Sequence, residues 1–589
     1  MRASSHQTSP GMVKSKPHAG RELHALPRGE KLEADVAVVG AGPAGIVISL
    51  ELARAGHRVL LVESGAMAFD PETQHLADTV GGDEYHVEMS VATRRQVGGA
   101  SNLWGGRCVP FDPVDFEPRP IVAESAWPLE YADVAPYLQR ACDWCHCGSA
   151  LFNSGELPGL ADRSIVPGFV DGDVRASDLE RWSLPTNFRR VYTRALESTP
   201  SLRLLTGLTC TEIVPRSALA GRSRWMVDHL EGRRDDGRRV TIRAQRYVIA
   251  AGGLESTRLL FASNSRHTAG IGNDSGHLGR WYMAHVETRV AQVRFSTEAE
   301  RTIYAHERDG DGVYVRRRFT LSPEVQLDQG LPNVAMWLVN PEIGDSSHRS
   351  GILSLVYLIL RSPIGRHLVA EGIRQAQLTT RRPTTLRAHL RNIARDLAPA
   401  IGFALTFGYR RFVARGRRVP GFFVRSVSNV YPVLYHGEHL PHWQSFVEPT
   451  DERDAHGMPR LRTHLHFSDA DIGAVRRVHE ILDRSLRMQG LGCVEFLYDD
   501  VEAAVRAQLF GGYHQAGTTR MSALPQDGVV DRRLAVHGFD DLFVASSSTF
   551  PTSSQANSTF MLIAFALRLA DHLSGELHRQ SPAPVELAS

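Results

Sequence analysis

The feature that most constrains this chain is a glycine-rich turn between a short apolar strand and a helix. Residues 35–39 (DVAVV) form a β-branched run typical of a buried parallel strand. The turn GAGPAG follows directly at residues 40–45. In this pattern Gly40 permits the tight turn, Gly42 lets the backbone approach a pyrophosphate, and Gly45 lets the helix pack closely on the strand. The pattern therefore predicts a phosphate-binding helix N-terminus.

A helix, a second strand and an acidic residue complete this unit. We predict a helix over residues 46–55 and a strand over residues 58–62, which leads directly to Glu63. Glu63 stands 18 residues after Gly45, where a ribose-binding acid belongs in a dinucleotide-binding unit. The unit indicates an α/β fold with a dinucleotide site, and an unrelated glycine turn is the alternative. The motif alone does not separate FAD from NAD.

Three later segments favour FAD. Residues 96–106 (QVGGASNLWGG) place four glycines around a polar pair and a Trp. Such a loop can lie flat against a large ring system while its backbone donates hydrogen bonds. Residues 247–253 (YVIAAGG) form a strand that runs into a glycine turn. The C-terminal segment begins with YHQAGTTRM at residues 513–521, closes with QANST at residues 555–559, and leads into a final helix.

With these motifs in this order, the chain resembles the glucose–methanol–choline (GMC) oxidoreductase family. The likeness extends across about 540 residues and is weakest over residues 290–500. It implies an α/β fold: a Rossmann-like FAD-binding domain assembled from discontinuous segments, and an α+β substrate domain with a mostly antiparallel sheet. The active site would lie between them. We expect residues 1–32 to be a disordered leader, residues 33–115, 200–288 and 505–576 to form the FAD-binding domain, and residues 116–199 and 289–504 to form the substrate domain.

The resemblance implies FAD as cofactor, with three departures from the family pattern. Some pyranose-oxidising relatives tether FAD through a His where this chain has Leu103, so we expect non-covalent FAD. The acid often found before the late Phe-Pro is missing from residues 545–548 (ASSS), and the usual Asn-Pro is Asn-Ser. Hydroxyl and backbone groups would replace that acid. The expected FAD-binding residues are Gly40, Gly42, Pro43, Ala44, Gly45, Glu63, Ser64, Gly98, Gly99, Ser101, Asn102, Gly105, Ala251, Gly252, Ser546, Ser547, Asn557 and Ser558.

His514 and Asn557 match the family's catalytic pair. Oxidation of an alcohol removes a hydride from carbon and a proton from oxygen. A neutral imidazole that titrates near pH 7 can take that proton. An amide can hold the hydroxyl oxygen and direct the C–H bond toward flavin N5. The alternatives are a His514 that caps a turn and an Asn557 that binds backbone, while we interpret His537 and Arg520 as structural.

The resemblance thus implies FAD-dependent oxidation of a CH–OH group with His514 as base. The loop residues 101–104 and the His–Asn pair favour a sugar, polyol or glycoside substrate. A hydrophobic or lipid-linked alcohol of the sterol or terpenoid type is the alternative. A third hypothesis is a redox-neutral flavoprotein lyase on the same fold. Oxygen, a quinone or another acceptor would take the electrons. The sequence does not separate an oxidase from a dehydrogenase, because reaction with oxygen depends on its access to the reduced flavin.

Cys142, Cys145, His146 and Cys147 bring three thiols and an imidazole into six residues. A structural zinc site usually has a second, distant pair of ligands, and no such pair is evident in the sequence. We therefore predict no metal site and interpret these cysteines as buried or partly buried residues of a helix.

Residues 361–418 are strongly basic. They contain thirteen arginines but only two acids, Glu371 and Asp396, in a chain whose net charge is +2. Leu, Ile, Phe and Tyr recur between the arginines at helical spacing. An arginine-rich amphipathic insertion of this kind can lie in an anionic membrane surface. A solvated helical cap on the substrate domain is the equally weighted alternative.

Composition excludes several other classes. The near-balanced charge gives no indication of a nucleic-acid partner, and six cysteines do not make a disulfide framework. The polar N-terminus lacks the apolar run of a secretory signal. We therefore expect a cytoplasmic protein, peripheral on the inner membrane surface if the basic segment binds lipid.

Overall fold

The computed structural model describes residues 32–580 apart from several short stretches. These are residue 82 and residues 123–125, 162, 184–185, 217–223, 369–373, 375–376, 379–384 and 415. The predicted leader lies outside the described residues except for Leu32, which is the first residue of a strand.

The glycine turn belongs to a seven-stranded sheet. Its order is β6–β2–β1–β9–β8–β7, and β19 also pairs with β9. β1 is parallel to β2 and β9, β2 to β6, and β19 to β9, whereas β8 is antiparallel to both its neighbours. The strands are β1 (Leu32–Val39), β2 (Val59–Val62), β6 (Leu202–Leu205), β7 (Leu208–Arg216), β8 (Met226–Arg234), β9 (Arg239–Ile249) and β19 (Leu542–Val544).

Two helices pack together against this sheet. α1 (Pro43–Arg54) lies along α15 (Ser558–Gln580), and ten of its residues are buried. α1 begins three residues before the predicted start at residue 46, because Gly42 is its N-cap and Pro43 suits the first helical position. The carboxyl ends of β1, β2 and β9 meet at one edge of the sheet, where parallel α/β sheets bind ligands.

A second sheet has six strands in the order β18–β10–β15–β14–β13–β4, and every pairing in it is antiparallel. Helix α13 (Asp469–Met488) contacts its edge strand β18, and the buried side chains of both elements belong to one apolar cluster. The strands are β4 (Val174–Arg175), β10 (His285–Phe295), β13 (Phe319–Leu321), β14 (Val334–Leu338), β15 (Val430–Glu438) and β18 (Gly492–Phe496).

Smaller elements complete the two parts. The order β11–β12–β5–β3 forms a four-stranded sheet, and β16 pairs with β17. These strands are β3 (Arg107–Cys108), β5 (Leu179–Trp182), β11 (Glu307–Arg308), β12 (Tyr314–Arg317), β16 (Phe446–Arg453) and β17 (Pro459–His464). Further helices are α4 (Leu138–Cys145), α5 (Phe188–Ser198), α6 (Gly253–Ala262), α7 (Pro323–Gln329) and α14 (Val501–Arg506).

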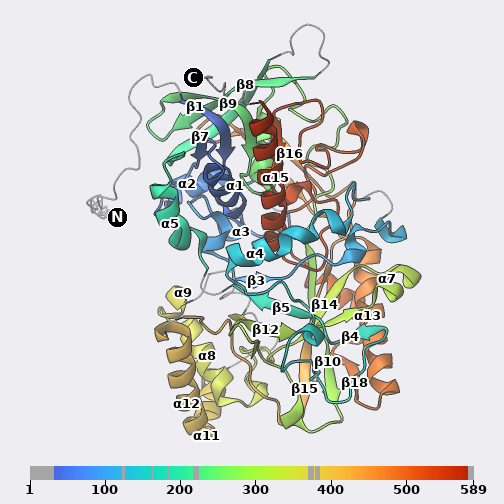
Figure 1. Ribbon diagram of the computed structural model, residues 1–589. Helices are drawn as coiled ribbons and strands as arrows, with labels where there is room; N and C mark the ends of the chain where they lie inside the picture. The colour runs from blue at the N-terminus through green and yellow to red at the C-terminus, as the bar shows by residue number, and fades with distance from the viewer. Residues whose placement is uncertain are drawn as a thin grey trace, which may run out of the picture.

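The two large sheets occupy opposite ends of the molecule (Figure 1). β1, β9, α1 and α15 lie at one end, and β10, β14, β15 and α13 at the other. The predicted α/β fold, with a Rossmann-like sheet and a mostly antiparallel second sheet, is confirmed. α4 packs on α15 and α5 on α1, although both lie within residues 116–199, which we assigned to the substrate domain. The residue boundaries of the two domains therefore stay a prediction.

The basic segment and the helix directly before it form a group of helices at one corner of the molecule (Figure 1). In the part of the chain that the structure describes, no helix is long and apolar enough to cross a membrane. The helices are α8 (Gly351–Arg361), α9 (Gly365–Leu368), α11 (Leu386–Arg395), α12 (Leu397–Gly408) and the π-helical turn η10 (Tyr409–Val413).

Candidate active site

The glycine turn leaves open space at the start of α1. Gly40 has a φ of +102°, and a Cβ there would lie 2.5 Å from the carbonyl oxygen of Ala250. A Cβ on Gly45 would lie 1.9 Å from the carbonyl oxygen of Gly40, so the helix contacts the strand at this point. A Cβ on Gly42 would meet nothing within 4 Å. No side chain caps α1, so its first N–H groups are free to bind an anion.

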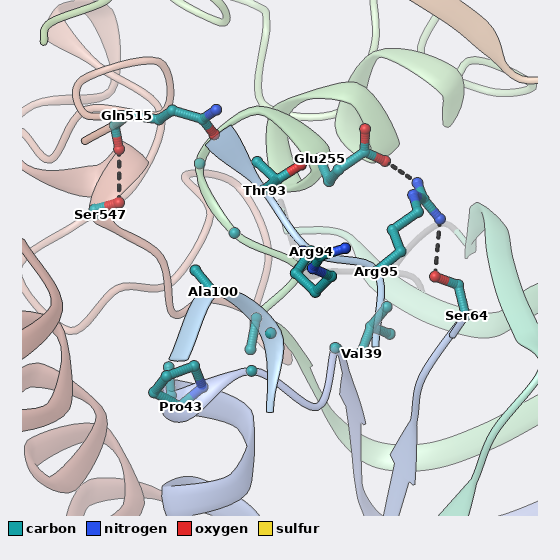
Figure 2. A pocket seen from close by; sticks show the side chains of 18 of the residues that line it. Val39, Pro43, Ser64, Thr93, Arg94, Arg95, Ala100, Glu255, Gln515 and Ser547 are labelled. Carbon is teal, nitrogen blue, oxygen red and sulfur yellow. Dashed lines mark hydrogen bonds and ion pairs between the residues drawn. The ribbon is translucent and has the colours of Figure 1, made fainter. Parts of the chain in front are cut away.

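A cavity with about 1350 Å³ of empty space, including its open mouth, runs along this edge of the sheet. Its lining begins at Glu63 and Ser64 after β2, passes the glycine turn, and reaches Ser547 and His514. Figure 2 shows Arg95 on its wall between two acceptors: it donates to Ser64 Oγ at 2.8 Å and also pairs with Glu255.

Glu63 fixes the turn from the next strand. One carboxylate oxygen accepts from the N–H of Ala41 and the other from the N–H of Gly65, each at 2.8 Å. Burial raises the pKa of Glu63, which these backbone donors oppose. Each oxygen keeps a free lone pair, so the ribose hydroxyl expected from the sequence can still be accepted.

The loop at residues 96–106 folds against the glycine turn. A Cβ on Gly99 would lie 2.9 Å from Gly42 Cα. Ser101 Oγ donates to Gly98 O at 2.6 Å, and Asn102 Nδ2 donates to Val97 O at 3.0 Å. These two side chains therefore brace the loop.

The predicted FAD-binding residues divide into two groups by position. Those that line the cavity are Gly40, Gly42, Pro43, Ala44, Glu63, Ser64, Gly99, Ala251, Gly252, Ser547 and Ser558. Those outside its lining are Gly45, Gly98, Ser101, Asn102, Gly105, Ser546 and Asn557.

The cavity fits an extended dinucleotide. It is long, it contains a free helix N-terminus, and it includes a polar atom without a partner. Ser558 Oγ is buried at the start of α15 and has no hydrogen-bond partner among the described residues. A pyrophosphate oxygen is a suitable acceptor for this hydroxyl.

His514 lines the cavity, and Asn557 lies beside it, just outside the lining. Arg107 Nη1 donates to Asn557 Oδ1 at 2.6 Å. A guanidinium can only donate, so this contact fixes which atom of the amide is the oxygen. Asn557 Nδ2 then donates to His514 Nε2 at 2.7 Å. His514 Nε2 is therefore the unprotonated nitrogen, and the proton sits on Nδ1.

Two further histidines continue the series of contacts that begins at His514. His514 Nδ1 lies 3.1 Å from His285 Nδ1, to which it donates. His285 stacks on His436 with ring centroids 4.3 Å apart. His436 Nδ1 donates to the carbonyl oxygen of Gln555 at 2.9 Å. The chain Arg107–Asn557–His514–His285 is thus a directed series of hydrogen bonds.

The electrostatics keep all three imidazoles neutral. Burial, and then the nearby Arg107, lower the pKa of His514 to about 4. Burial likewise holds the pKa values of His285 and His436 well below the usual range. Burial also lowers the pKa of Arg107 to about 10, although Glu180 lies 2.6 Å from its Nε. Arg107 therefore stays cationic at pH 7.

Nitrogens of His285, His436 and His514 lie within 4.8 Å of one another, a grouping that could hold a metal ion. We predicted no metal site, and these three histidines share no motif in the sequence. Arg107 next to these histidines disfavours a second cation at the same place.

Comparisons with known proteins find two matching family models and several distant relatives. Residues 441–566 match the family model described as GMC oxidoreductase, and residues 33–71 match an FAD binding domain. A 2-methyl-1,2-propanediol dehydrogenase from Mycolicibacterium austroafricanum is 22% identical, over 92% of this chain and 95% of its own. Paromamine 6'-oxidase from Streptomyces fradiae is 26% identical, over 44% of this chain and 55% of its own.

The chain is similar to GMC oxidoreductases, through the family model matched by residues 441–566 and through a relative that covers 92% of its length. It is an FAD-dependent oxidoreductase that acts on CH–OH donors, and FAD is its cofactor. Among solved structures, pyridoxine 4-oxidase from Mesorbium loti covers 93% of this chain and 99% of its own, with 17% identity and a TM-score of 0.47.

Sequence reasoning missed three residues of this candidate site. Arg107 directly follows the glycine-rich loop, and that position was the one available signal. His285 and His436 lie on neighbouring strands of the second sheet, in the part of the chain with no family motif. Two isolated histidines 151 positions apart carry no pattern that would pair them.

Other residues singled out in the sequence have structural surroundings. Cys142, Cys145 and Cys147 are buried at α4, and the electrostatic neighbours of their thiols include Cys108. Arg520 lies over the Trp281 ring, 4.6 Å from its centroid. In addition, His537 Nε2 lies 3.0 Å from Ser522 Oγ.

Proposed function

We propose that this GMC enzyme oxidises a CH–OH group with His514 as the base. The observation that carries the proposal is the neutral His514, whose unprotonated Nε2 lies beside the Asn557 amide. A substrate hydroxyl that replaces this hydrogen bond would donate its proton to Nε2 and accept from Asn557 Nδ2. FAD, when bound, accepts the hydride from the carbinol carbon.

The surrounding residues prepare this step. Arg107 holds Asn557 Oδ1, so the amide presents its N–H group to the oxygen. His285 accepts from His514 Nδ1 and thereby keeps the proton off Nε2. The developing imidazolium would be stabilised by that same hydrogen bond. These groups act by positioning, since none of them needs to exchange a proton.

We infer a polyhydroxylated or amino-substituted substrate from the second sheet. Glu287 lies directly opposite His436 in the β10–β15 pairing and shares a strand face with His285. Burial raises the pKa of Glu287. The ring of Trp337, against which Arg107 packs at 4.2 Å, adds an aromatic surface nearby. Carboxylate, imidazole and indole together suit a sugar, polyol or glycoside rather than a sterol or terpenoid alcohol.

The names of the relatives support the same substrate class. One is a dehydrogenase of a diol and another an oxidase of paromamine. A hydrophobic or lipid-linked alcohol stays the alternative substrate. The acceptor is proposed to be oxygen, a quinone or another compound. A cytoplasmic location and contact of residues 361–418 with an anionic membrane surface complete the proposal.

The reaction class can be tested by flavin bleaching. The purified protein should be yellow. It should release its flavin on acid precipitation, because Leu103 cannot form the covalent bond that a His makes at this position in some relatives. Anaerobic addition of polyols, glycosides and amino sugars, with sterols and terpenoid alcohols in parallel, should bleach the visible band with the first group. A redox-neutral lyase would show no bleaching with its substrate. Measuring peroxide against dye reduction with an active substrate then identifies the acceptor class.

Glu287 provides the test of substrate class. Glu287→Gln keeps the size of the side chain but removes its charge. We expect KM for an active polyol or amino sugar to rise about tenfold, while kcat changes little, because Glu287 takes no part in the proposed proton and hydride transfer. Glu495→Gln, on the exposed edge strand of the same sheet, is the control. Unchanged KM values for every polar substrate would remove Glu287 from the binding site.

A further inference from the structure

The helix α12 exposes an apolar stripe. Ala400 is its only buried residue. Leu397, Ile401 and Leu405 are 52%, 50% and 71% exposed, and their spacing of four places them on one side of the helix. The stripe continues into η10, where Tyr409, Phe412 and Val413 are also exposed. Folded soluble proteins rarely expose so continuous an apolar surface without a partner for it.

The opposite side of these helices is packed. Phe403 and Phe407 of α12 contact Phe422, with ring centroids 5.2 and 5.5 Å apart. On α11, His389 stacks on Tyr357 of α8 at 4.2 Å. The outward direction of the stripe is therefore set by tertiary contacts and not by a loosely held helix.

Cationic side chains border the stripe. On α11, Leu386 and Leu390 are exposed, and each is followed by an exposed arginine, Arg387 and Arg391. Arg410 is exposed on η10. Asp396 is the only acid in residues 385–418, and it lies 3.3 Å from Arg395. The border thus carries a large excess of positive charge.

We propose that α11, α12 and η10 form a membrane-docking face. The stripe of Leu397, Ile401 and Leu405 enters the boundary of the acyl chains in an anionic bilayer. Arg387, Arg391 and Arg410 contact the lipid phosphates beside it. Their aliphatic stems cover apolar surface while their charged ends stay at the headgroups.

The charge distinguishes a bilayer from a second copy of the chain. Two copies joined through this face would bring two arginine-rich borders together, and like charges at an interface oppose association. An anionic lipid surface supplies the opposite charge. α11 and α12 lie at an outer corner of the molecule, away from α1 and α15 (Figure 1).

Vesicle co-sedimentation tests the proposal with the FAD-loaded enzyme. Wild-type protein should sediment with phosphatidylserine–phosphatidylcholine vesicles at low salt, weaken with added salt, and stay in solution with phosphatidylcholine alone. The triple variant Arg387→Gln, Arg391→Gln, Arg410→Gln should bind about 100-fold more weakly, about fivefold for each arginine. Ile401→Glu with Leu405→Glu should abolish sedimentation, because an acid would enter the apolar boundary.

Matched controls use the same substitutions elsewhere. Met488→Glu changes another apolar side chain that is 70% exposed. Arg194→Gln, Arg266→Gln and Arg484→Gln neutralise three exposed arginines outside the face. These variants should bind vesicles like wild type, and every variant should keep its flavin reduction rate in solution. The docking test therefore does not depend on the substrate proposed above.

Three outcomes would overturn the proposal. One is wild-type protein that stays in the supernatant with anionic vesicles at low salt. Another is sedimentation that all the docking variants retain. The third is a concentration-dependent dimer, lost in Leu405→Glu, which would assign the face to a second copy. If the glutamate variants fail to fold, Ile401→Trp replaces them: its added fluorescence should be quenched by brominated lipid, and no quenching would also contradict insertion.

Discussion

Arg107 determines which way the Asn557 amide points, and through that amide it determines which nitrogen of His514 carries a proton. The assignment needs no observed hydrogens, because a guanidinium has donors only. Asn557 Oδ1 must accept from Arg107, so Nδ2 donates to His514 Nε2. A base in the wrong tautomer could not accept the substrate proton. Arg107 is thus a positioning residue for the proposed reaction.

Arg107→Gln should slow flavin reduction. Without Arg107 the Asn557 amide is no longer held in one orientation. The anaerobic rate of flavin reduction should therefore fall about 10- to 100-fold, with a smaller change in KM. Loss of the cation should also raise the pKa of His514, since Arg107 helps to lower it. Arg316→Gln is the control, because Arg316 shares the partner Glu180 but is not bonded to Asn557. Stopped-flow reduction at wild-type rate in Arg107→Gln would remove this role.

The pH dependence of kcat/KM should report His514 directly. The pKa of about 4 means that Nε2 is unprotonated throughout the neutral range. We expect kcat/KM to be flat from about pH 6 to 8 and to fall about tenfold for each pH unit below about 4. His514→Ala should keep its flavin and lose reduction by orders of magnitude. pH-jump stopped-flow, with bound flavin as the check on folding, gives the profile. An acidic limb near pH 6.5 would show that His514 is solvated.

At the scale of elements, the β1–α1–β2 unit was predictable because its signals are local. Glycines, a β-branched run and an acid at fixed spacing specify the strand, turn, helix and strand without reference to the rest of the chain. The other strands of the sheet were harder to predict. β9, which pairs with β1, and β19, which pairs with β9, lie about 200 and 500 residues after β1, and only the family resemblance placed them in the same domain. The helix start was wrong by three residues because the glycines were assigned to the turn alone.

Gly45 tests the close contact inside that unit. Gly45→Ala would place a methyl group 1.9 Å from the carbonyl oxygen of Gly40, which must move the turn. We expect lower FAD occupancy and a lower Tm. The control is Gly473→Ala in α13, where a Cβ meets nothing within 4 Å. That change should leave FAD binding intact and stabilise the fold by about 0.5–1 kcal/mol. Equal flavin content and Tm in Gly45→Ala and wild type would contradict the contact.

At the scale of the whole molecule, the candidate active site joins residues from both halves of the structure. The sequence predicted His514 and Asn557 because they lie in a motif near the C-terminus. His285 and His436 could not be predicted, since only the register of β10 against β15 brings them under His514. Glu287 could not be predicted for the same reason. Pairing of distant strands depends on the packed core rather than on local residue order.

The buried histidines should make the whole fold sensitive to acid. His479 lies buried in α13 against Tyr435, and burial lowers its pKa to about 4. Its unfolded value is about 6.5, so the unfolded chain binds the proton first and stability falls as pH drops from about 6.5 to 4. This histidine alone accounts for up to about 3 kcal/mol of that loss. His514, His285 and His436 act in the same direction.

His479→Phe should therefore protect the protein against acid. A phenyl ring keeps the stacking against Tyr435 but cannot bind a proton. We expect the urea midpoint, followed by tryptophan fluorescence, to fall less between pH 7 and pH 5 in the variant than in wild type, while the two agree more closely at pH 7. His75→Gln, at an exposed histidine, should behave like wild type. If His479→Phe lost as much stability on acidification as wild type, protonation of this histidine would not drive the acid response, and the carboxylates paired in the folded state would become its source.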